Sequence, residues 1–190
     1  MREYDIRGIV GETLSADDAY AIGRSFGSIV SQNRGRTVAV GYDGRHSSPG
    51  FEKVLVDGLT DCGLEVVRIG LGGTPMLYFA VHDMAADAGI MVSGSHNPPD
   101  FNGFKMVLSD RPFFGPDIQN LGAVAEKNQW VSGSGISHNC EIIEKYVARI
   151  LNDYSSPRGL KVAWDSGNGA AGPAMEKLIE SLPGTHYTLN

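Results

Sequence analysis

Residues 37–92 read TVAVGYDGRHSSPGFEKVLVDGLTDCGLEVVRIGLGGTPMLYFAVHDMAADAGIMV. Short apolar runs rich in β-branched residues alternate here with stretches that repeat apolar residues at helical spacing. We expect strands over 37–41, 65–69 and 88–92, and helices over 51–62 and 75–85. Parallel strands need crossovers of this kind, because the chain must return to the same end of the sheet before it can enter the next strand. The stretch therefore predicts an α/β fold with a mostly parallel mixed sheet and helices on both faces.

The flanking segments extend this pattern. Ser15 precedes a helical repeat of apolar residues with two aspartates in its first turn, as at a helix N-terminus. We expect residues 103–108 to form one further strand, antiparallel at an edge of the sheet, and residues 117–130 to form a weaker helix. The polar, Gly/Ser-rich stretch 131–139 resembles a linker.

The sequence predicts three segments. A first domain spans residues 1–137, a connecting helix and linker span 138–156, and residues 157–190 begin a second α/β domain. In this last segment residues 160–165 are predicted to form a strand, and a helix is expected over 173–182. One strand and one helix cannot bury a core alone, so we expect the chain to stop inside the second domain, as a fragment or a truncated product.

Composition excludes several classes of protein. The 190 residues hold 16 Lys and Arg against 22 Asp and Glu, a net charge of −6, which argues against nucleic acid as a partner because phosphate binding needs a basic face. Two cysteines, Cys62 and Cys140, are too few for a disulfide scaffold and fit a reducing compartment. No apolar run is long enough to span a membrane, and the N-terminus is charged from Arg2 onward. We expect a soluble cytoplasmic protein without a membrane partner.

The stretch 93–105, SGSHNPPDFNGFK, carries the strongest chemical signal. A predicted buried strand ends directly before it, Gly94 permits a tight turn and Pro98 stiffens the exit, so Ser95 could be presented on a fixed elbow as a nucleophile. A cluster of Gly, Ser, Asn and Pro is more often a plain turn, but a turn has no need of His96. The spacing differs from the G-x-S-x-G elbow of acyl transfer, which indicates a different serine chemistry.

Residues 93–105 resemble the phosphoserine loop of the α-D-phosphohexomutase family, in its phosphomannomutase/phosphoglucomutase branch. REYDIRG at 2–8 is similar to the N-terminal motif of that branch, and GYDGRHSSP at 41–49 is similar to its next loop. The resemblance spans essentially the whole chain. It implies that Ser95 carries a phosphoryl group and passes it to a hexose monophosphate, which turns over as a bisphosphate and returns its other phosphoryl group to the serine.

The resemblance also implies partners and cofactors. The substrate would be mannose or glucose phosphate, with hexose 1,6-bisphosphate as activator and Mg²⁺ as the metal. The family holds Mg²⁺ with the phosphoserine, here Ser95, and an acidic Asp-Gly-Asp-Gly-Asp-Arg type loop of the second domain, and no such run occurs between residues 160 and 190. Because that loop and domains three and four are missing, we expect this chain alone to lack efficient activity.

Further site residues follow from the resemblance and from charge. We place Arg7 and Lys105 at the phosphoserine, because a guanidinium binds phosphate oxygens bidentately and an ammonium can give or take a proton. His96 either orients the loop and contacts the phosphate, or is a loop histidine bonded to backbone. The remaining candidates for contact with substrate or phosphate are Tyr4, Arg45 and Asn97.

Other interpretations stay open at this stage. The chain could be a non-catalytic isolated domain or a partner-binding piece, and the same loop could belong to a serine phosphatase or hydrolase. The turn at 166–169 precedes a predicted helix and could bind an anion, but packing of the second domain is the role we favour for it. An assay of this chain alone, and then with the missing domains supplied, separates these alternatives.

Overall fold

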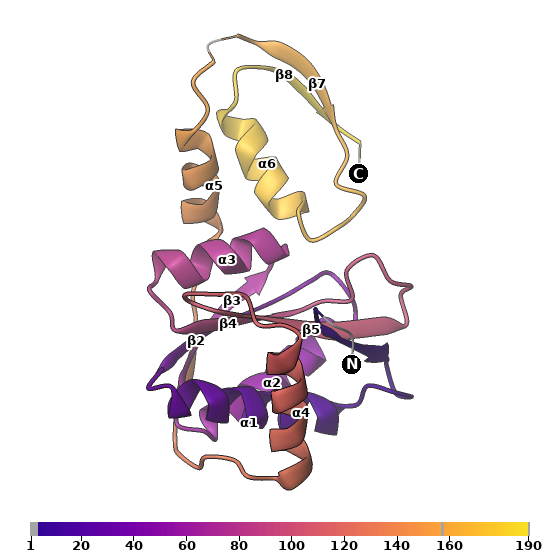
Figure 1. The fold of residues 1–190 in the computed structure, drawn as a ribbon. Coiled ribbons are helices and arrows are strands. Elements are labelled where there is room, and N and C mark those ends of the chain that lie inside the picture. Colours follow the sequence, from indigo (N-terminus) through magenta and orange to yellow (C-terminus); the bar gives the residue numbers. More distant parts are fainter. Residues whose placement is uncertain (1–3, 157, 190) are drawn as a thin grey trace.

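The computed structural model describes residues 4–156 and 158–189 of the chain, with strands and helices in alternation (Figure 1). Arg2 and Glu3 of the N-terminal motif lie outside the described residues, as does Pro157. The strands are β1 (Ile6–Ile9), β2 (Thr37–Tyr42), β3 (Glu65–Leu71), β4 (Ala88–Val92), β5 (Phe101–Leu108), β6 (Ile136–Asn139), β7 (Leu160–Trp164) and β8 (Gly184–Thr188). The helices are α1 (Ala16–Gln32), α2 (Ser48–Thr60), α3 (Thr74–Asp83), α4 (Pro116–Lys127), α5 (Ile143–Asn152) and α6 (Gly172–Ser181).

Six strands form the central sheet in the order β1-β5-β4-β2-β3-β6. Strands β2, β3, β4 and β6 run parallel, whereas β5 is antiparallel to both of its neighbours. The mostly parallel mixed sheet predicted from the sequence is thus confirmed. The expected edge position of residues 103–108 is wrong, because β1 pairs with the outer side of β5 and places Arg7 opposite Gly103.

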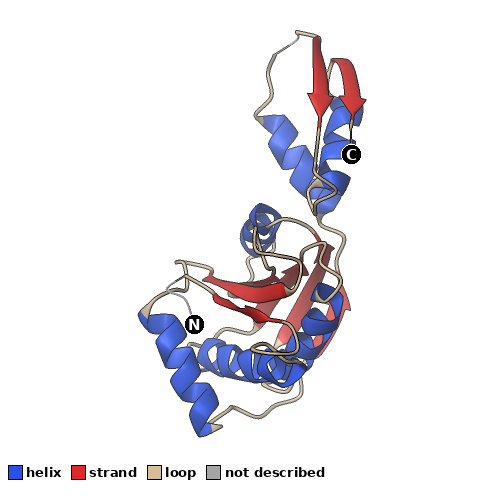
Figure 2. Cartoon of the chain, turned by 90° about the vertical axis from the view of Figure 1, so that its right-hand side faces the viewer, coloured by secondary structure: helices blue, strands red, loops and turns tan. Residues whose placement is uncertain are grey.

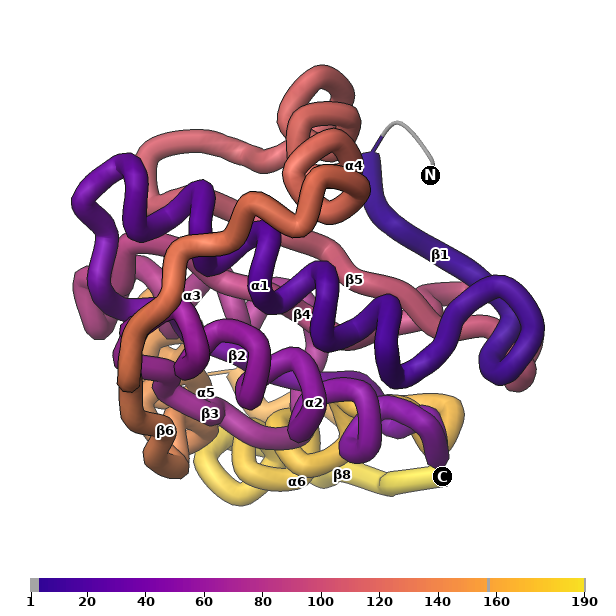
Figure 3. Tube along the Cα trace, turned by 90° about the horizontal axis from the view of Figure 1, so that it is seen from below, coloured from indigo at the N-terminus to yellow at the C-terminus, as the bar shows by residue number. Residues whose placement is uncertain are grey.

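Helices cover both faces of this sheet, as predicted. Figures 1 and 3 show α1, α2 and α4 across one face, while α3 lies on the other face with α5 stacked beyond it. Each face has its own apolar core: Phe26, Leu55 and Ile90 are fully buried on the first, and Leu77 and Met91 on the second. Helix α1 begins at a capping box, in which the Ser15 hydroxyl accepts from the Asp18 backbone N–H and the Asp18 carboxylate accepts from the Ser15 backbone N–H.

The stretch expected to be a linker, residues 131–139, is instead part of the domain. Its end forms β6, which pairs in parallel with β3, so the expected domain boundary after Ser137 falls inside a strand. Before β6, the backbone N–H groups of Gly133 and Gly135 donate to carbonyls at the end of α2. The glycines here allow close backbone contact, and all four β6 residues are exposed, which is why their polar character suggested a linker.

Residues 158–189 form a separate small unit. Strands β7 and β8 pair in parallel, and α6 lies between them in the sequence. Figure 2 shows this unit projecting from the layered domain. The sequence prediction of one strand and one helix missed β8. No residue of α6 is buried, and the two strands of the unit are exposed or half-buried. Across the described residues, no helix is long and apolar enough to cross a membrane.

Candidate active site

The loop that begins after the carboxyl end of β4 presents Ser95 to solvent. Residues 93–100 form this loop, the serine loop. Ser95 has φ of 54°, in the left-handed region that residues other than glycine rarely adopt. Its backbone N–H donates to the Ser93 hydroxyl at 3.0 Å, and its own hydroxyl lies 3.3 Å from His96 Nδ1. A serine held in this conformation must be stabilised by its surroundings, and such strained positions cluster at functional sites.

Arg45 holds the serine loop through backbone carbonyls. Nη2 donates to the carbonyls of Ser95 (2.9 Å) and Asn97 (2.6 Å), and Nη1 donates to those of Pro98 (2.6 Å) and Phe101 (2.9 Å). We predicted that Arg45 contacts substrate or phosphate, but in the structure both terminal nitrogens donate to carbonyls of the serine loop and of Phe101, the first residue of β5. Arg45 is therefore placed to shape the loop, because one rigid guanidinium joins four carbonyls.

Asp43 supports the same loop from the other side. Its carboxylate accepts from the Gly94 backbone N–H at 3.0 Å and from the Ser48 hydroxyl at 2.6 Å, and it lies 3.4 Å from Arg45 Nε. Gly94 is needed here, because a Cβ would lie 2.3 Å from Arg45 Nε. Buried Asn102 extends the network by donating to the hydroxyls of Ser48 (2.9 Å) and Ser47. The sequence analysis selected neither Asp43 nor Asn102 as a site residue.

The cations Arg7 and Lys105 lie together beside the serine loop. Arg7 Nη1 donates to Asn97 Oδ1, which joins β1 to the loop. Arg7 Nε and Nη2 donate to Asp5 Oδ2 at 3.0 and 2.7 Å, and Lys105 Nζ lies 3.7 Å from the same oxygen. The structure thus brings Arg7, Asn97 and Lys105 together, and it adds a carboxylate, Asp5, that the sequence analysis did not select.

Tyr4 has a different neighbour. Tyr4 is 62% exposed, and its ring stacks on Phe114, with ring centroids 6.1 Å apart. The side chain is therefore directed toward the segment before α4 rather than toward Ser95. Tyr4 can therefore make its predicted contact only with a substrate that enters beside the segment before α4.

A cleft of about 660 Å³ opens at Ser95. One wall is formed by the serine loop and by the loop from Asp43 to His46, and the opposite wall by the turn 167–171 at the start of α6. We favoured a packing role for this turn from the sequence. The structure places it across the cleft from Ser95, so it borders the space that a substrate would enter.

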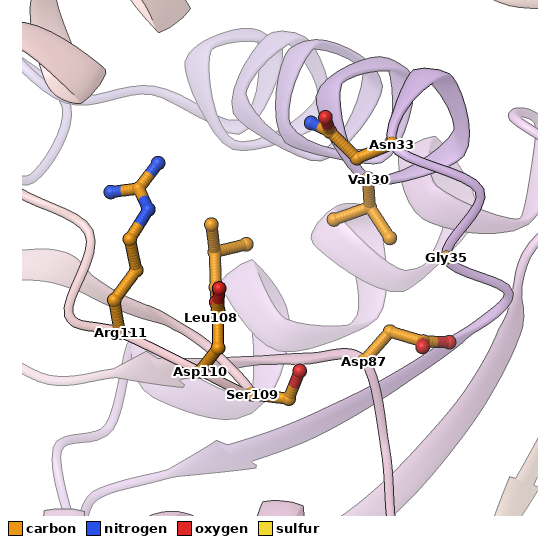
Figure 4. A pocket seen from close by; sticks show the side chains of 8 residues that line it. All are labelled: Val30, Asn33, Gly35, Asp87, Leu108, Ser109, Asp110 and Arg111. Atoms are coloured by element: carbon orange, nitrogen blue, oxygen red, sulfur yellow. The ribbon is translucent and has the colours of Figure 1, made fainter.

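A second cavity, of about 340 Å³, lies at the opposite end of the sheet (Figure 4). It is lined by the end of α1, by Gly35 before β2, by Asp87 before β4, and by residues 108–111 at and after the end of β5. The Asp87 carboxylate accepts from the backbone N–H groups of Arg36 and Thr37, at 2.7 and 2.9 Å. Asp87 thus caps the start of β2. Ligands of open α/β sheets bind at the carboxyl ends of the strands, which is the end where Ser95 lies and not the end where this cavity lies.

The described residues do not form a metal site. Between residues 4 and 189, Pro157 excepted, no group of three or more His, Cys, Asp or Glu side chains could hold a metal ion. Ser95 would offer ligands only through the oxygens of a phosphoryl group, and Mg²⁺ takes near-octahedral oxygen coordination. This part of the chain therefore does not fit Mg²⁺ on its own.

Comparison with known proteins assigns the family. A sequence model described as "Phosphoglucomutase/phosphomannomutase, alpha/beta/alpha domain I" matches residues 1–131. The chain belongs to the phosphoglucomutase/phosphomannomutase family. It is 44% identical over 182 residues to a phosphomannomutase/phosphoglucomutase of Pseudomonas aeruginosa, covering 96% of this chain and 39% of that protein. A phosphoglucomutase of Neisseria meningitidis is 40% identical over 184 residues, covering 96% of this chain and 40% of that protein.

A solved structure extends the likeness to the fold. The crystal structure of a phosphoglucomutase/phosphomannomutase family protein from Burkholderia thailandensis matches with a TM-score of 0.94 at 41% identity. The match covers 99% of this chain and 43% of that one. The chain thus spans about two-fifths of the length of the family members it matches.

Proposed function

We propose that this chain is the N-terminal part of a phosphohexomutase that moves a phosphoryl group between the 1- and 6-positions of a hexose phosphate, with Ser95 as the phosphoryl carrier. The observation that carries the proposal is the serine loop itself. Its nucleophile is exposed in a strained left-handed conformation, clamped by Arg45 and Asp43 and flanked by Arg7 and Lys105. The names of the relatives support mannose and glucose phosphates as the substrates.

In the first half of the proposed reaction, a sugar hydroxyl attacks the phosphorus of phosphorylated Ser95. The bond from phosphorus to Ser95 Oγ breaks as the bond to the sugar oxygen forms. The attacking hydroxyl gives up its proton, and Ser95 Oγ takes up a proton as it leaves, which restores the serine hydroxyl. Lys105 is the group proposed to pass the proton from the sugar hydroxyl to Ser95 Oγ, and the positive charge of Arg7 stabilises the negative charge on the transferring phosphoryl oxygens. The resulting hexose 1,6-bisphosphate turns over in the cleft and returns its other phosphoryl group to Ser95.

Two residues of the loop have supporting roles in this proposal. Asn97 holds Arg7 against the serine loop, and His96 lies near enough to Ser95 Oγ to hydrogen-bond the phosphoryl group or the free hydroxyl. A phosphoserine carries close to two negative charges, so it needs several such donors.

We propose that Mg²⁺ reaches the phosphoryl group with carboxylate ligands from domains beyond this chain. The full mutase cycle is then expected only when the remaining domains are present, and hexose 1,6-bisphosphate is the proposed activator that first loads Ser95. No step above depends on the metal, because the described residues supply no site for it.

The test is to incubate the chain with glucose 1,6-bisphosphate and to follow intact mass and peptide maps. We expect one phosphoryl group on Ser95, none in Ser95→Ala, and normal labelling in the matched control Ser134→Ala, which removes the hydroxyl of an exposed serine outside the serine loop. Labelling of Ser93 in the wild type would contradict the assignment.

The alternatives predict other results. Release of inorganic phosphate without return to a sugar would indicate a phosphatase, and a chain that never becomes labelled, even when joined to the remaining domains of the Pseudomonas aeruginosa relative, would indicate a non-catalytic domain.

A further inference from the structure

Asp5 is one of the few charged residues buried in the layered domain, with 5% of its surface exposed. A buried carboxylate is costly unless it is paired and hydrogen-bonded. Asp5 Oδ2 accepts two hydrogen bonds from Arg7 and lies 3.7 Å from Lys105 Nζ. One carboxylate oxygen is therefore shared by the two cations that flank the serine loop.

The register of β1 on β5 explains this arrangement. Ile6 lies opposite Phe104 and Arg7 opposite Gly103. Alternate residues of a strand share a face, and opposite residues of an antiparallel pair share a face, so Asp5, Arg7 and Lys105 lie on the same side of the sheet. Gly103 leaves the space that the Arg7 side chain crosses, because a Cβ there would lie 3.0 Å from Arg7 Cγ.

The carboxylate also determines which donors of Arg7 are available. A guanidinium has five N–H donors. Asp5 engages Nε and Nη2, and Asn97 engages Nη1, which leaves one N–H on each terminal nitrogen. Each of these N–H groups can donate to an oxygen of a phosphoryl group.

We infer that Asp5 is a positioning residue for phosphoryl transfer, which orients the Arg7 guanidinium and keeps the Lys105 ammonium beside it. Asp5 acts through these two cations, since its side chain is only 7% exposed and its Oδ2 faces them. The inference rests on the proposed function of Ser95 and goes beyond it, because it concerns a carboxylate that does not touch the phosphoryl group.

The first experiment measures the rate at which glucose 1,6-bisphosphate phosphorylates Ser95 in the full chain, followed by intact mass. Asp5→Asn keeps the shape of the side chain and removes its charge. We expect this variant to lose about 10–100-fold in rate, the range for a displaced catalytic group. Asp117→Asn is the matched control, because Asp117 also accepts two hydrogen bonds from one arginine, Arg111, outside the site. Its rate should equal that of the wild type.

A double-mutant cycle separates positioning from a general structural role. If Asp5 acts through Arg7, then Asp5→Asn costs much less in the Arg7→Met background than in the wild type. Effects that multiply independently would overturn the inference. If the Asp5→Asn variant does not fold, Asp5→Glu is tested in its place. This variant keeps the charge and shifts the carboxylate by one methylene, so the rate should fall. A wild-type rate would contradict the positioning role.

A second readout distinguishes failure of the inference from failure of the proposed function. A wild-type chain that is never phosphorylated on Ser95 counts against the proposed function alone. In that case inorganic phosphate is titrated into the unphosphorylated chain and followed by NMR. Asp5→Asn should weaken phosphate binding about 2–10-fold, since Arg7 must then be ordered on binding. Equal affinities would overturn the inference.

Discussion

The layered domain and the β7–α6–β8 unit are built from the same elements, strands joined by helices, yet they differ in burial. In the layered domain two apolar cores enclose side chains such as Phe26 and Leu77 completely. In the β7–α6–β8 unit no residue of α6 is buried, and Tyr187 of β8 is 55% exposed. One helix can cover only one face of a two-stranded sheet. The other face of the sheet therefore stays open to water.

The cleft at Ser95 lies between these two regions. The serine loop belongs to the layered domain and is held by side chains that are themselves packed, whereas the turn 167–171 belongs to the exposed unit. All side chains that we assign to the chemistry come from the first region. The comparison therefore predicts that substitutions in the layered domain have large effects and that comparable ones in the small unit have small effects.

The largest effect is expected at Lys105. Lys105→Met keeps the apolar stem and removes the ammonium, so we expect the mutase rate to fall about 10²–10⁴-fold in an enzyme completed with the remaining domains of the Pseudomonas aeruginosa relative. Lys105→Arg should lose a similar amount if the lysine exchanges a proton, because a guanidinium does not readily give one up. Exposed Lys53 provides the control, Lys53→Met. A Lys105→Met enzyme with normal turnover would remove Lys105 from the site.

Much of the fold could be predicted from the sequence, because buried strands leave a strong pattern. Strands β2, β3 and β4 are rich in apolar residues, and they match the predicted ranges closely. Strands β6 and β8 could not be found this way. All residues of β6 are exposed, and those of β8 are exposed or half-buried, so neither needs an apolar run.

The site was predictable only in part. Ser95, Arg7 and Lys105 lie in recognisable motifs, and the structure brings Arg7 and Lys105 together beside the serine loop. The contacts of Arg45 could not be foreseen, because they depend on where four backbone carbonyls lie in space. Asp5 was overlooked because a carboxylate near a charged N-terminus resembles an ordinary solvated residue.

The second prediction tests the difference in burial directly. Phe26 is fully buried and packs edge-on against Phe113, with centroids 5.2 Å apart. Phe26→Ala should lower the free energy of unfolding by about 3–5 kcal/mol. Leu178→Ala in half-buried α6 should cost about 1 kcal/mol, because less apolar surface is lost. Denaturant unfolding measures both. Equal losses would show that the small unit buries its apolar face as well as the layered domain does.

The third prediction concerns the rigidity of the serine loop. Arg45→Met removes the guanidinium that donates hydrogen bonds to four backbone carbonyls, so the loop should lose its fixed shape. Phosphoryl transfer to Ser95 should then fall about 10²-fold. Hydrogen exchange at residues 94–101 should accelerate. Arg45→Lys should not restore the rate, since an ammonium cannot reproduce the planar fork. Exposed Arg36 provides the control, Arg36→Met. Unchanged exchange in the Arg45→Met loop would show that other contacts fix its shape.

The smallest effect is expected at the surface pair of Arg111 and Asp117. The guanidinium holds the pKa of Asp117 below its ordinary value of 3.8, chiefly through their hydrogen bonds. Because the folded pKa is lowered, this stabilisation is present above pH 3.8 and is lost as pH falls through the folded pKa. Asp117→Asn should lower Tm slightly at neutral pH, as expected for a surface ion pair. The difference should vanish in strong acid, and a difference that persists there would assign it to another cause.

The path of the chain has a consequence for synthesis. Arg7 and Asn97 hydrogen-bond to each other although 90 residues separate them. A ribosome adding about 5–20 residues per second needs about 5–20 s to make that stretch. During this interval the residues of β1 exist without β5, their partner in the sheet. Arg7 is thus synthesised early but reaches its place only after β5 has been made, so a nascent chain cannot assemble the proposed phosphoryl-binding site until β1 has paired with β5.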